Sequence, residues 1–153
     1  MDVVVRDRVE ADLPACVEAL RRVHEADDYP REWPADPASW LCPAACVGTW
    51  VATLDRDVVG HVVTTAPDAG RAWVSRLFVT PSAQRRGVAA ALLEVAGEDA
   101  RSVGRSLELG VVEESTAAIA LYERLGWTLL GREPAPFTWP DGTRPTQRRY
   151  RAP

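Results

Sequence analysis

Apolar residues recur along the chain with two different periods, and each period predicts one kind of element. A spacing of three or four residues marks one face of a helix, whereas short runs rich in β-branched residues mark strands. We expect helices over residues 12–25, 88–103 and 115–125, with a further short helix opening at Pro37. We expect strands over residues 3–6, 49–54, 58–65, 72–80, 107–112, 127–130 and 147–151.

The order of these elements predicts the fold class. A compact turn at residues 55–57 joins two strands into an antiparallel hairpin, and two strand–helix units follow later in the chain. We therefore expect an α+β fold in which a mixed, mostly antiparallel central sheet is flanked by helices. No repeat or linker divides the 153 residues, so residues 1–153 are expected to form a single domain.

Composition and charge limit the classes of partner. Hydrophobic residues make up 46% of the chain and charged residues 26%, which is typical of a globular protein in water. The formal net charge of −4 provides no general attraction to nucleic acid or to an anionic membrane, which argues against both as partners. The first residues lack the features of a secretory signal, and we expect a cytoplasmic protein.

The cysteines predict neither a metal site nor a disulfide framework. Cys16, Cys42 and Cys46 are odd in number, and their spacing matches no zinc-binding pattern. Cys16 lies on the apolar face of the first predicted helix and is expected in the core. We predict no bound metal and a reduced, intracellular setting.

The segment between the predicted strand 72–80 and helix 88–103 carries the clearest chemistry. A helix N-terminus has unpaired N–H groups and partial positive charge. Gly87 and Ala89 let an anion approach the backbone closely, and Arg85 and Arg86 add positive charge. The pattern favours a phosphate or pyrophosphate cradle, although an ordinary loop with solvated arginines has the same pattern. The Gly-rich signatures of P-loops and dinucleotide folds are missing.

A second segment places Tyr122 on the helix that follows strand 107–112. A phenol keeps its proton at neutral pH, so Tyr122 could donate a proton to a departing thiolate. An aromatic residue at helical spacing is also common in a protein core, so this position alone leaves both interpretations open.

Together the two segments resemble the GNAT superfamily of N-acetyltransferases. The pattern Gln84-x-x-Gly87-x-Ala89, after the strand that ends at residues 77–81, is similar to the acetyl-CoA-binding signature of that superfamily. Residues 118–127 are similar to its second signature, and the element order of nearly the whole chain also matches. Two positions depart from the pattern: Ala89 replaces a glycine, and Ser115 replaces a frequent asparagine.

The resemblance implies acetyl-CoA, or another acyl-CoA, as co-substrate, bound where the sheet splays apart between its fourth and fifth strands. Backbone amides of residues 85–89 would bind the pyrophosphate, strand residues 77–79 would pair with the pantetheine arm, and Tyr122 would be the general acid. The implied cofactor-binding residues are Leu77, Phe78, Val79, Gln84, Arg85, Arg86, Gly87, Val88, Ala89 and Ser115.

The resemblance also implies an amine acceptor, either a small molecule or a peptide. The amine must lose a proton to attack the thioester, and Glu113 and Glu114, just past a strand beside the thioester, are the preferred catalytic candidates for that role. His24 and His61 are further candidates, although a structural role is favoured for His61. The loop after the first helix combines acidic and aromatic residues, which suits a cationic, partly apolar amine. The predicted acceptor contacts are Glu25, Asp28, Tyr29, Trp33 and Arg76.

Two other functions fit the same pattern. A non-catalytic acyl-CoA-binding regulatory module would bind CoA without turnover. A tRNA-directed GNAT toxin would need a basic face, for which the arginines clustered at the C-terminus are the candidates: Arg144, Arg148, Arg149 and Arg151. If strand 147–151 is an exposed sheet edge, it could pair across a homodimer.

Overall fold

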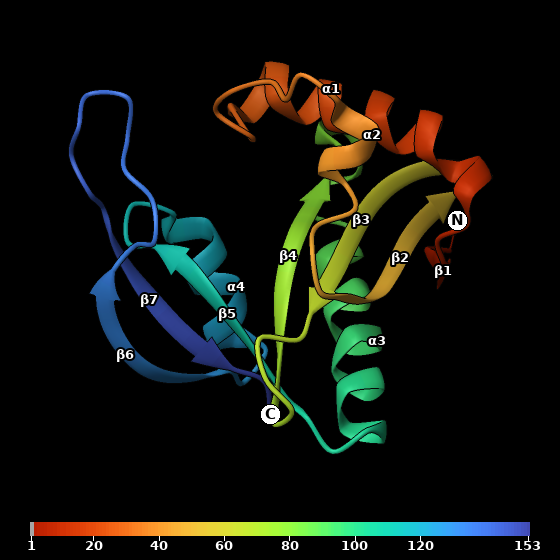
Figure 1. Cartoon of the computed structure of the whole chain (residues 1–153). Helices are drawn as coiled ribbons and strands as arrows, with labels where there is room; N and C mark the ends of the chain where they lie inside the picture. Colours follow the sequence, from red (N-terminus) through yellow and green to blue (C-terminus); the bar gives the residue numbers. More distant parts are fainter. Residues whose placement is uncertain (1) are drawn as a thin grey trace.

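The computed structural model describes residues 2–153, which fold into one seven-stranded sheet covered by helices (Figure 1). The strands are β1 (Val4–Asp7), β2 (Cys46–Leu54), β3 (Asp57–Thr65), β4 (Arg71–Val79), β5 (Ser106–Val112), β6 (Thr128–Pro134) and β7 (Thr146–Arg151). The helices are α1 (Leu13–Asp27), α2 (Pro37–Trp40), α3 (Val88–Ser102) and α4 (Thr116–Arg124), with 3-10 turns at Glu10–Asp12 and Pro81–Ala83. The expected α+β fold class is confirmed.

The strands lie in the order β1-β2-β3-β4-β5-β7-β6. Every neighbouring pair is antiparallel except β4 and β5, which are parallel. The last strand, β7, is inserted between β5 and β6, and its Tyr150 is fully buried. The expectation that residues 147–151 form an exposed edge is therefore wrong, because both sides of β7 are paired, and the dimer contact inferred from that edge loses its basis.

The sheet opens between β4 and β5, as predicted. These two strands pair only where Arg71–Trp73 of β4 meet Ser106–Glu108 of β5. Beyond these pairs β4 continues to Val79 and β5 to Val112 without pairing with each other, and the two halves of the sheet spread into a V (Figure 1). The unpaired strand edges leave backbone donors and acceptors free along both walls of the opening.

Helix α3 packs closely on one face of the sheet. Leu92 and Ala96 of this helix are buried against strand residues such as Val62. At Gly60 the approach is so close that a Cβ atom would lie 2.7 Å from the Val88 side chain. Glycine at this strand position therefore lets the N-terminal turn of α3 rest directly on the sheet, which fixes the loop that precedes the helix.

Helix α1 covers the opposite face of the same strands. Its buried residues Cys16 and Leu20 pack with Val51 and Phe78 in a second hydrophobic cluster. The core position expected for Cys16 is confirmed. Helix α4 packs beside the other half of the sheet, where Ile119 joins the larger cluster. Among the described residues, no helix is long and apolar enough to cross a membrane.

Candidate active site

The loop before α3 presents free backbone amides at the end of the helix. Arg85 and Gly87 both have backbone angles in the left-handed region, with φ of 67° and 77°. Within residues 2–153, no backbone carbonyl accepts a hydrogen bond from the N–H groups of residues 85–90. Consecutive free amides at a positive helix end are the arrangement that binds phosphate groups. The loop therefore fits the pyrophosphate of a nucleotide cofactor.

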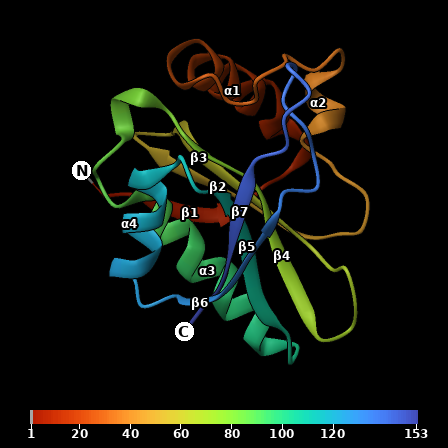
Figure 2. The same cartoon turned by 90° about the vertical axis from the view of Figure 1, so that its left-hand side faces the viewer.

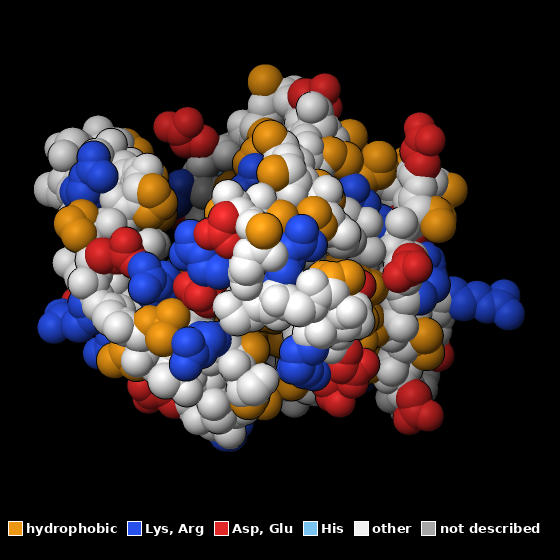
Figure 3. Space-filling view, turned by 60° about the horizontal axis from the view of Figure 1, so that its bottom comes forward, with side chains coloured by type: hydrophobic (Ala, Val, Ile, Leu, Met, Phe, Trp, Pro, Cys, Tyr) orange, Lys and Arg blue, Asp and Glu red, His pale blue; other side chains and the backbone are white. Residues whose placement is uncertain are grey.

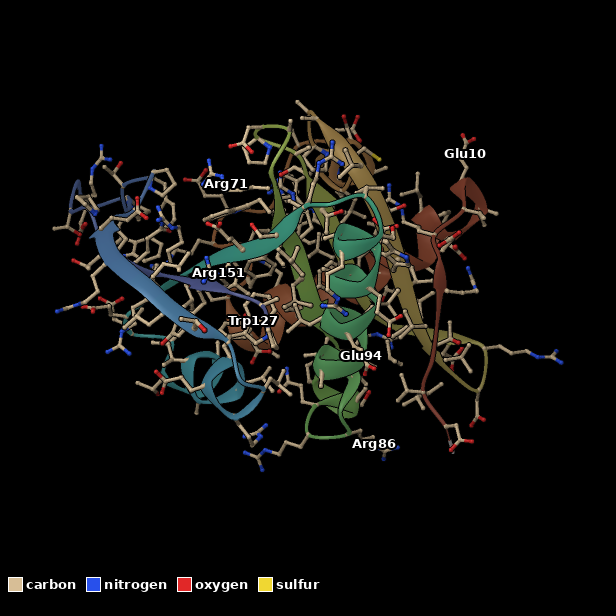
Figure 4. The ribbon with its side chains drawn as sticks, turned by 90° about the horizontal axis from the view of Figure 1, so that it is seen from below. Glu10, Arg71, Arg86, Glu94, Trp127 and Arg151 are labelled. Carbon is tan, nitrogen blue, oxygen red and sulfur yellow. The ribbon has the colours of Figure 1, made fainter. Side chains whose placement is uncertain are left out.

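The side chains of this loop have different roles. Val88 is buried in the core, so only its backbone faces the loop. The Gln84 amide nitrogen donates to the Asp27 carboxylate at 2.8 Å and to the Val79 carbonyl at 3.3 Å, which fastens the loop to α1 and β4. Arg85 and Arg86 are exposed, and Figure 4 shows Arg86 at the N-terminal end of α3. The arginines can therefore add charge to an anion held by the backbone.

The opening between β4 and β5 contains a cavity of about 340 Å³. Leu77 of β4 and Leu109 of β5 contribute to its opposite walls. Phe78 is buried on the other side of β4, where its ring stacks on His61 with 5.0 Å between ring centroids. Of the strand residues predicted to contact a cofactor, Leu77 can do so with its side chain, whereas Phe78 can do so only through its backbone.

A β-bulge shapes the β4 wall of this cavity. The pairing of β3 with β4 shifts between His61 and Val63, and Arg76 lies opposite the shift with a φ of 53°. The Arg76 carbonyl lies 2.8 Å from His61 Nδ1, so this nitrogen must carry the hydrogen. His61 Nε2 then accepts from Arg8 at 2.8 Å. Burial lowers the pKa of His61 to about 4. His61 is thus a neutral structural residue that holds the bulge.

The Arg76 side chain is occupied within the protein. Its Nε donates to the Trp40 carbonyl at 2.9 Å, and its guanidinium carbon lies 3.9 Å from the centre of the Trp40 ring. Burial lowers the pKa of Arg76. The guanidinium that was expected to bind an acceptor carboxylate is therefore already engaged, and its clearest role is to hold α2 against β4.

Tyr122 lines the same cavity from α4. Its ring packs against Trp127 and Tyr150, and its hydroxyl group makes no hydrogen bond to any of the described residues. Burial, with a smaller effect of the nearby Tyr29, raises the pKa of Tyr122 to about 12. Tyr122 therefore keeps its proton at neutral pH and can donate it into the cavity.

A larger groove of about 1580 Å³ lies beside this cavity. It runs between the α1–α2 segment, the end of β5 and the β6–β7 loop, which approach one another in Figure 2. The guanidinium carbon of Arg31 lies 3.7 Å from the centre of the Trp139 ring and so connects the first segment to that loop. The groove is lined by the aromatic residues Tyr29, Trp33, Trp40, Phe137 and Trp139 and by the acids Asp27, Asp28, Glu32 and Glu114.

Three of the five predicted acceptor residues, Asp28, Tyr29 and Trp33, line this groove, and so does the candidate base Glu114. Arg76 lines the smaller cavity instead. Glu25 lines neither cavity, because α1 continues to Asp27 and leaves Glu25 exposed on the helix.

Glu113 was placed among the catalytic candidates, but the structure directs it elsewhere. It lines neither cavity and forms ion pairs with Arg132 and Arg148. The hydrogen bond from Arg132 is the main reason why the pKa of Glu113 is lowered. A carboxylate held by two arginines is a weak base, which leaves Glu114 as the better placed of the two adjacent acids.

Three of the residues shared by the cavity and the groove were not singled out from the sequence. Gly110, Phe137 and Gln147 line both the cavity and the groove. The aromatic pair Phe137 and Trp139, in a loop before the final strand, is a sequence signal for such a wall. No comparable signal exists for Gly110 and Gln147, because they meet only through the insertion of β7 beside β5.

The chain matches the model of a known protein family. Residues 13–127 match the family model described as the acetyltransferase (GNAT) family, and the chain belongs to that family. No curated protein matches the chain in sequence closely enough to establish a nearer relative.

Solved structures share the fold over almost the whole chain. The ribosomal-protein-S18-alanine N-acetyltransferase from Escherichia coli has a TM-score of 0.76 at 22% identity, covering 99% of this chain and 94% of that one. NAA60 of Arabidopsis thaliana in complex with acetyl-CoA has a TM-score of 0.75 at 18% identity, covering 98% and 97%. Ard1 from Thermoplasma volcanium has a TM-score of 0.74 at 19% identity, covering 100% and 99%.

Proposed function

We propose that this protein is an N-acetyltransferase that transfers an acetyl group, or another acyl group, from acetyl-CoA to a primary amine of a small molecule or peptide. One observation carries the proposal: the loop of the anion cradle is hydrogen-bonded to Asp27, which lines the acidic, aromatic groove, and this groove adjoins the cavity that Tyr122 lines. Two structural neighbours were solved with acetyl-CoA, which supports this choice of co-substrate.

The protein groups available to acetyl-CoA follow its length. The backbone amides of residues 85–89 suit the pyrophosphate, as argued above for the loop. Past Trp73 the edge of β4 is unpaired toward β5, so its backbone groups can pair with the amides of the pantetheine arm. Ser115 lies at the start of α4 without a side-chain capping bond, so its hydroxyl group is free to contact the cofactor. When bound, the cofactor supplies a thioester carbonyl for attack.

Tyr122 then completes the transfer as general acid. The amine nitrogen bonds to the thioester carbon, the carbon–sulfur bond breaks, and the departing thiolate takes the phenol proton. The attacking amine gives up its own proton, directly or through water, to a carboxylate of the groove, for which Glu114 and Asp28 are the candidates.

The groove supports a cationic, partly apolar acceptor. Its carboxylates attract an ammonium group, and its aromatic rings offer both apolar contact and cation–π interaction. The name of the Escherichia coli neighbour states that it acts on the alanine of a ribosomal protein, which keeps a peptide N-terminus among the candidate acceptors. The wide groove has room for such a chain.

The alternatives have less support. A regulatory acyl-CoA-binding module would not need a protonated phenol in the cavity, which favours the enzyme. The C-terminal arginines do not form a free basic stripe: Arg148 pairs with Glu113, and Arg149 pairs with Glu108 and Glu133. On the face seen in Figure 3, acidic and basic side chains are interspersed. This arrangement favours an amine over a tRNA as acceptor.

The test is acetyl-CoA-dependent CoA release with a panel of amines. The panel should contain an alanyl hexapeptide with a free N-terminus, tryptamine, spermidine and lysine, with product mass read by mass spectrometry. We expect at least one amine to gain an acetyl group at a rate well above the uncatalysed reaction. Binding of acetyl-CoA without acetylation of any amine would instead support the regulatory module.

A further inference from the structure

We propose that the carboxamide of Gln147 is the polar contact that holds the acceptor amine at the junction between groove and cavity. The inference rests on the proposed function and assigns an acceptor-binding residue within it. Neither the family signatures nor the periodicity of the chain points to this side chain.

The position of Gln147 is the first observation. Four residues line both the acceptor groove and the cavity beside Tyr122, namely Tyr29, Gly110, Phe137 and Gln147. An amine that enters from the groove must pass these residues to reach a thioester in the cavity. Gln147 carries the only carboxamide among the four, and three of the four offer no more than a ring, a phenol or backbone.

The burial of Gln147 is the second observation. The residue is 7% exposed, yet its carboxamide makes no hydrogen bond with any group of residues 2–153. Neither the oxygen nor the nitrogen of the carboxamide is among the fully buried side-chain atoms that lack a partner, so both remain accessible from the space that Gln147 lines. An accessible, unpaired carboxamide on a residue that is otherwise buried and borders two cavities is suited to a ligand.

The fit between Gln147 and Gly110 is the third observation. Val112 of β5 is the cross-strand partner of Gln147 on β7, which places Gln147 and Gly110 on the same face of the sheet. A Cβ atom at Gly110 would lie 2.6 Å from Gln147 Oε1 and 2.9 Å from its Cδ. The carboxamide thus occupies the space that a side chain at position 110 would fill, and glycine is needed there for the carboxamide to lie flat on β5.

The chemistry of the carboxamide matches an attacking amine. Its oxygen accepts an N–H hydrogen bond and its nitrogen donates two, and the group carries no charge at any working pH. It can therefore orient a neutral amine without stabilising the unreactive ammonium form, a task for which a carboxylate is less suited. In this arrangement Gln147 positions the acceptor, and the proton is taken by another group.

Steady-state kinetics of three variants test the proposal, using whichever amine of the panel gives the highest kcat/KM. Gln147→Leu removes the polar group at similar size, and we expect kcat/KM for the amine to fall about tenfold or more, while the Kd of acetyl-CoA stays within about twofold. Gly110→Ala leaves the carboxamide present but displaced, and we expect a loss in the same direction. Thr146→Ala, at an exposed side chain of the same strand, is the matched control and should behave as wild type.

The double variant Gly110→Ala with Gln147→Leu shows whether the two substitutions lower kcat/KM through the same interaction or independently. If Gly110 acts by placing Gln147, the double variant should be no worse than Gln147→Leu alone. Unchanged kcat/KM in Gln147→Leu, or a loss that appears equally in acetyl-CoA affinity, would overturn the proposal while the enzyme assignment stands.

Two other outcomes of these experiments also have a defined consequence. If wild type acetylates no amine of the panel, the proposed function fails, and the role of Gln147 fails with it. If Gln147→Leu does not fold, as judged by its melting curve, Gln147→Met replaces it with the same expected loss.

Discussion

At the scale of single residues, the proposed chemistry depends most on Tyr122. Its ring packs against Trp127 and Tyr150, its hydroxyl group is unpaired among the described residues, and the residue lines the cavity between β4 and β5. Burial raises its pKa to about 12, so the proton stays on the phenol throughout the neutral range. The environment therefore prepares the phenol to donate rather than to accept a proton.

The first prediction concerns the substitution Tyr122→Phe. It removes the hydroxyl group and keeps the ring that packs with Trp127, so stability should change little. We expect kcat to fall about a hundredfold or more, the usual contribution of a positioned general acid, with acetyl-CoA affinity unchanged. Single-turnover kinetics and calorimetry measure the two quantities. A variant with wild-type kcat would show that the thiolate leaves without help from Tyr122.

The second prediction concerns His61 and the pH dependence of stability. The pKa of His61 is 6.5 in the unfolded chain and is lowered to about 4 in the folded protein, mainly by burial. Between these values the unfolded chain binds more protons, so the stabilisation present above pH 6.5 is lost as the pH falls toward 4. We expect the free energy of unfolding to drop by on the order of 1 to 3 kcal/mol over that window.

Urea unfolding of wild type and His61→Gln at several pH values measures this effect. The glutamine variant should be less stable at pH 7.5 and should lose less stability on acidification. Asp12, whose pKa is lowered to about 2 chiefly by its hydrogen bond from Arg6, contributes only at lower pH. An equal loss in both proteins between pH 6.5 and pH 4.5 would rule out His61 as the titrating group.

At the scale of elements, the loop that leads into α3 is the proposed site of cofactor binding. Gly87 has a φ of 77°, and a Cβ atom there would have no neighbour within 4 Å, so glycine is required by the backbone conformation and not by space. Gly104, just past the other end of α3, has a φ of 74° and an equally open surrounding. The two glycines form a natural pair with the same conformation at opposite ends of one helix.

The third prediction compares Gly87→Ala with Gly104→Ala. An alanine in the left-handed region costs about 1 to 2 kcal/mol, so both variants should be destabilised by similar amounts. Only Gly87→Ala distorts the amides of the cradle, and we expect it alone to weaken acetyl-CoA binding, by about tenfold or more. Equal affinities for acetyl-CoA in the two variants would mean that the loop does not hold the pyrophosphate.

The elements also show how far the sequence could be interpreted. Helix α3 and strands β2 to β5 were predicted within a few residues, because their apolar residues follow the helical or strand period. Strand β6 was predicted over residues 127–130 but spans Thr128–Pro134, since Gly131, Arg132 and Glu133 carry no apolar pattern and are placed only by pairing with β7. Elements defined by their own side chains were predictable, and those defined by a partner were not.

The same limit applies to the site. The cradle and Tyr122 belong to continuous segments, and the sequence indicated both. The contact of Gln147 with Gly110 depends on two strands far apart in the chain, and their pairing requires β7 to lie inside the sheet. Likewise, Glu113 became an ion-pair partner only because β6 and β7 bring Arg132 and Arg148 beside it.

At the scale of the whole molecule, the two halves of the sheet enclose the chemistry. One half, with β1 to β4, α1 and α3, provides the anion cradle, and the other, with β5 to β7 and α4, provides Tyr122 and Gln147 (Figure 1). The halves are connected by the short parallel pairing at the base of the V. A ligand that contacts both walls should therefore hold the halves together and stabilise the fold.

The most direct test of the central claim is calorimetric titration with acetyl-CoA, CoA and ATP, accompanied by thermal unfolding. We predict selective binding of both CoA species and, at ligand concentrations of a hundred times Kd, stabilisation of about 2.7 kcal/mol. ATP, which lacks the pantetheine arm that β4 would bind, should bind more weakly. Folded protein that binds neither CoA species would contradict the assignment of the loop before α3 as a pyrophosphate site, and with it the proposed enzyme.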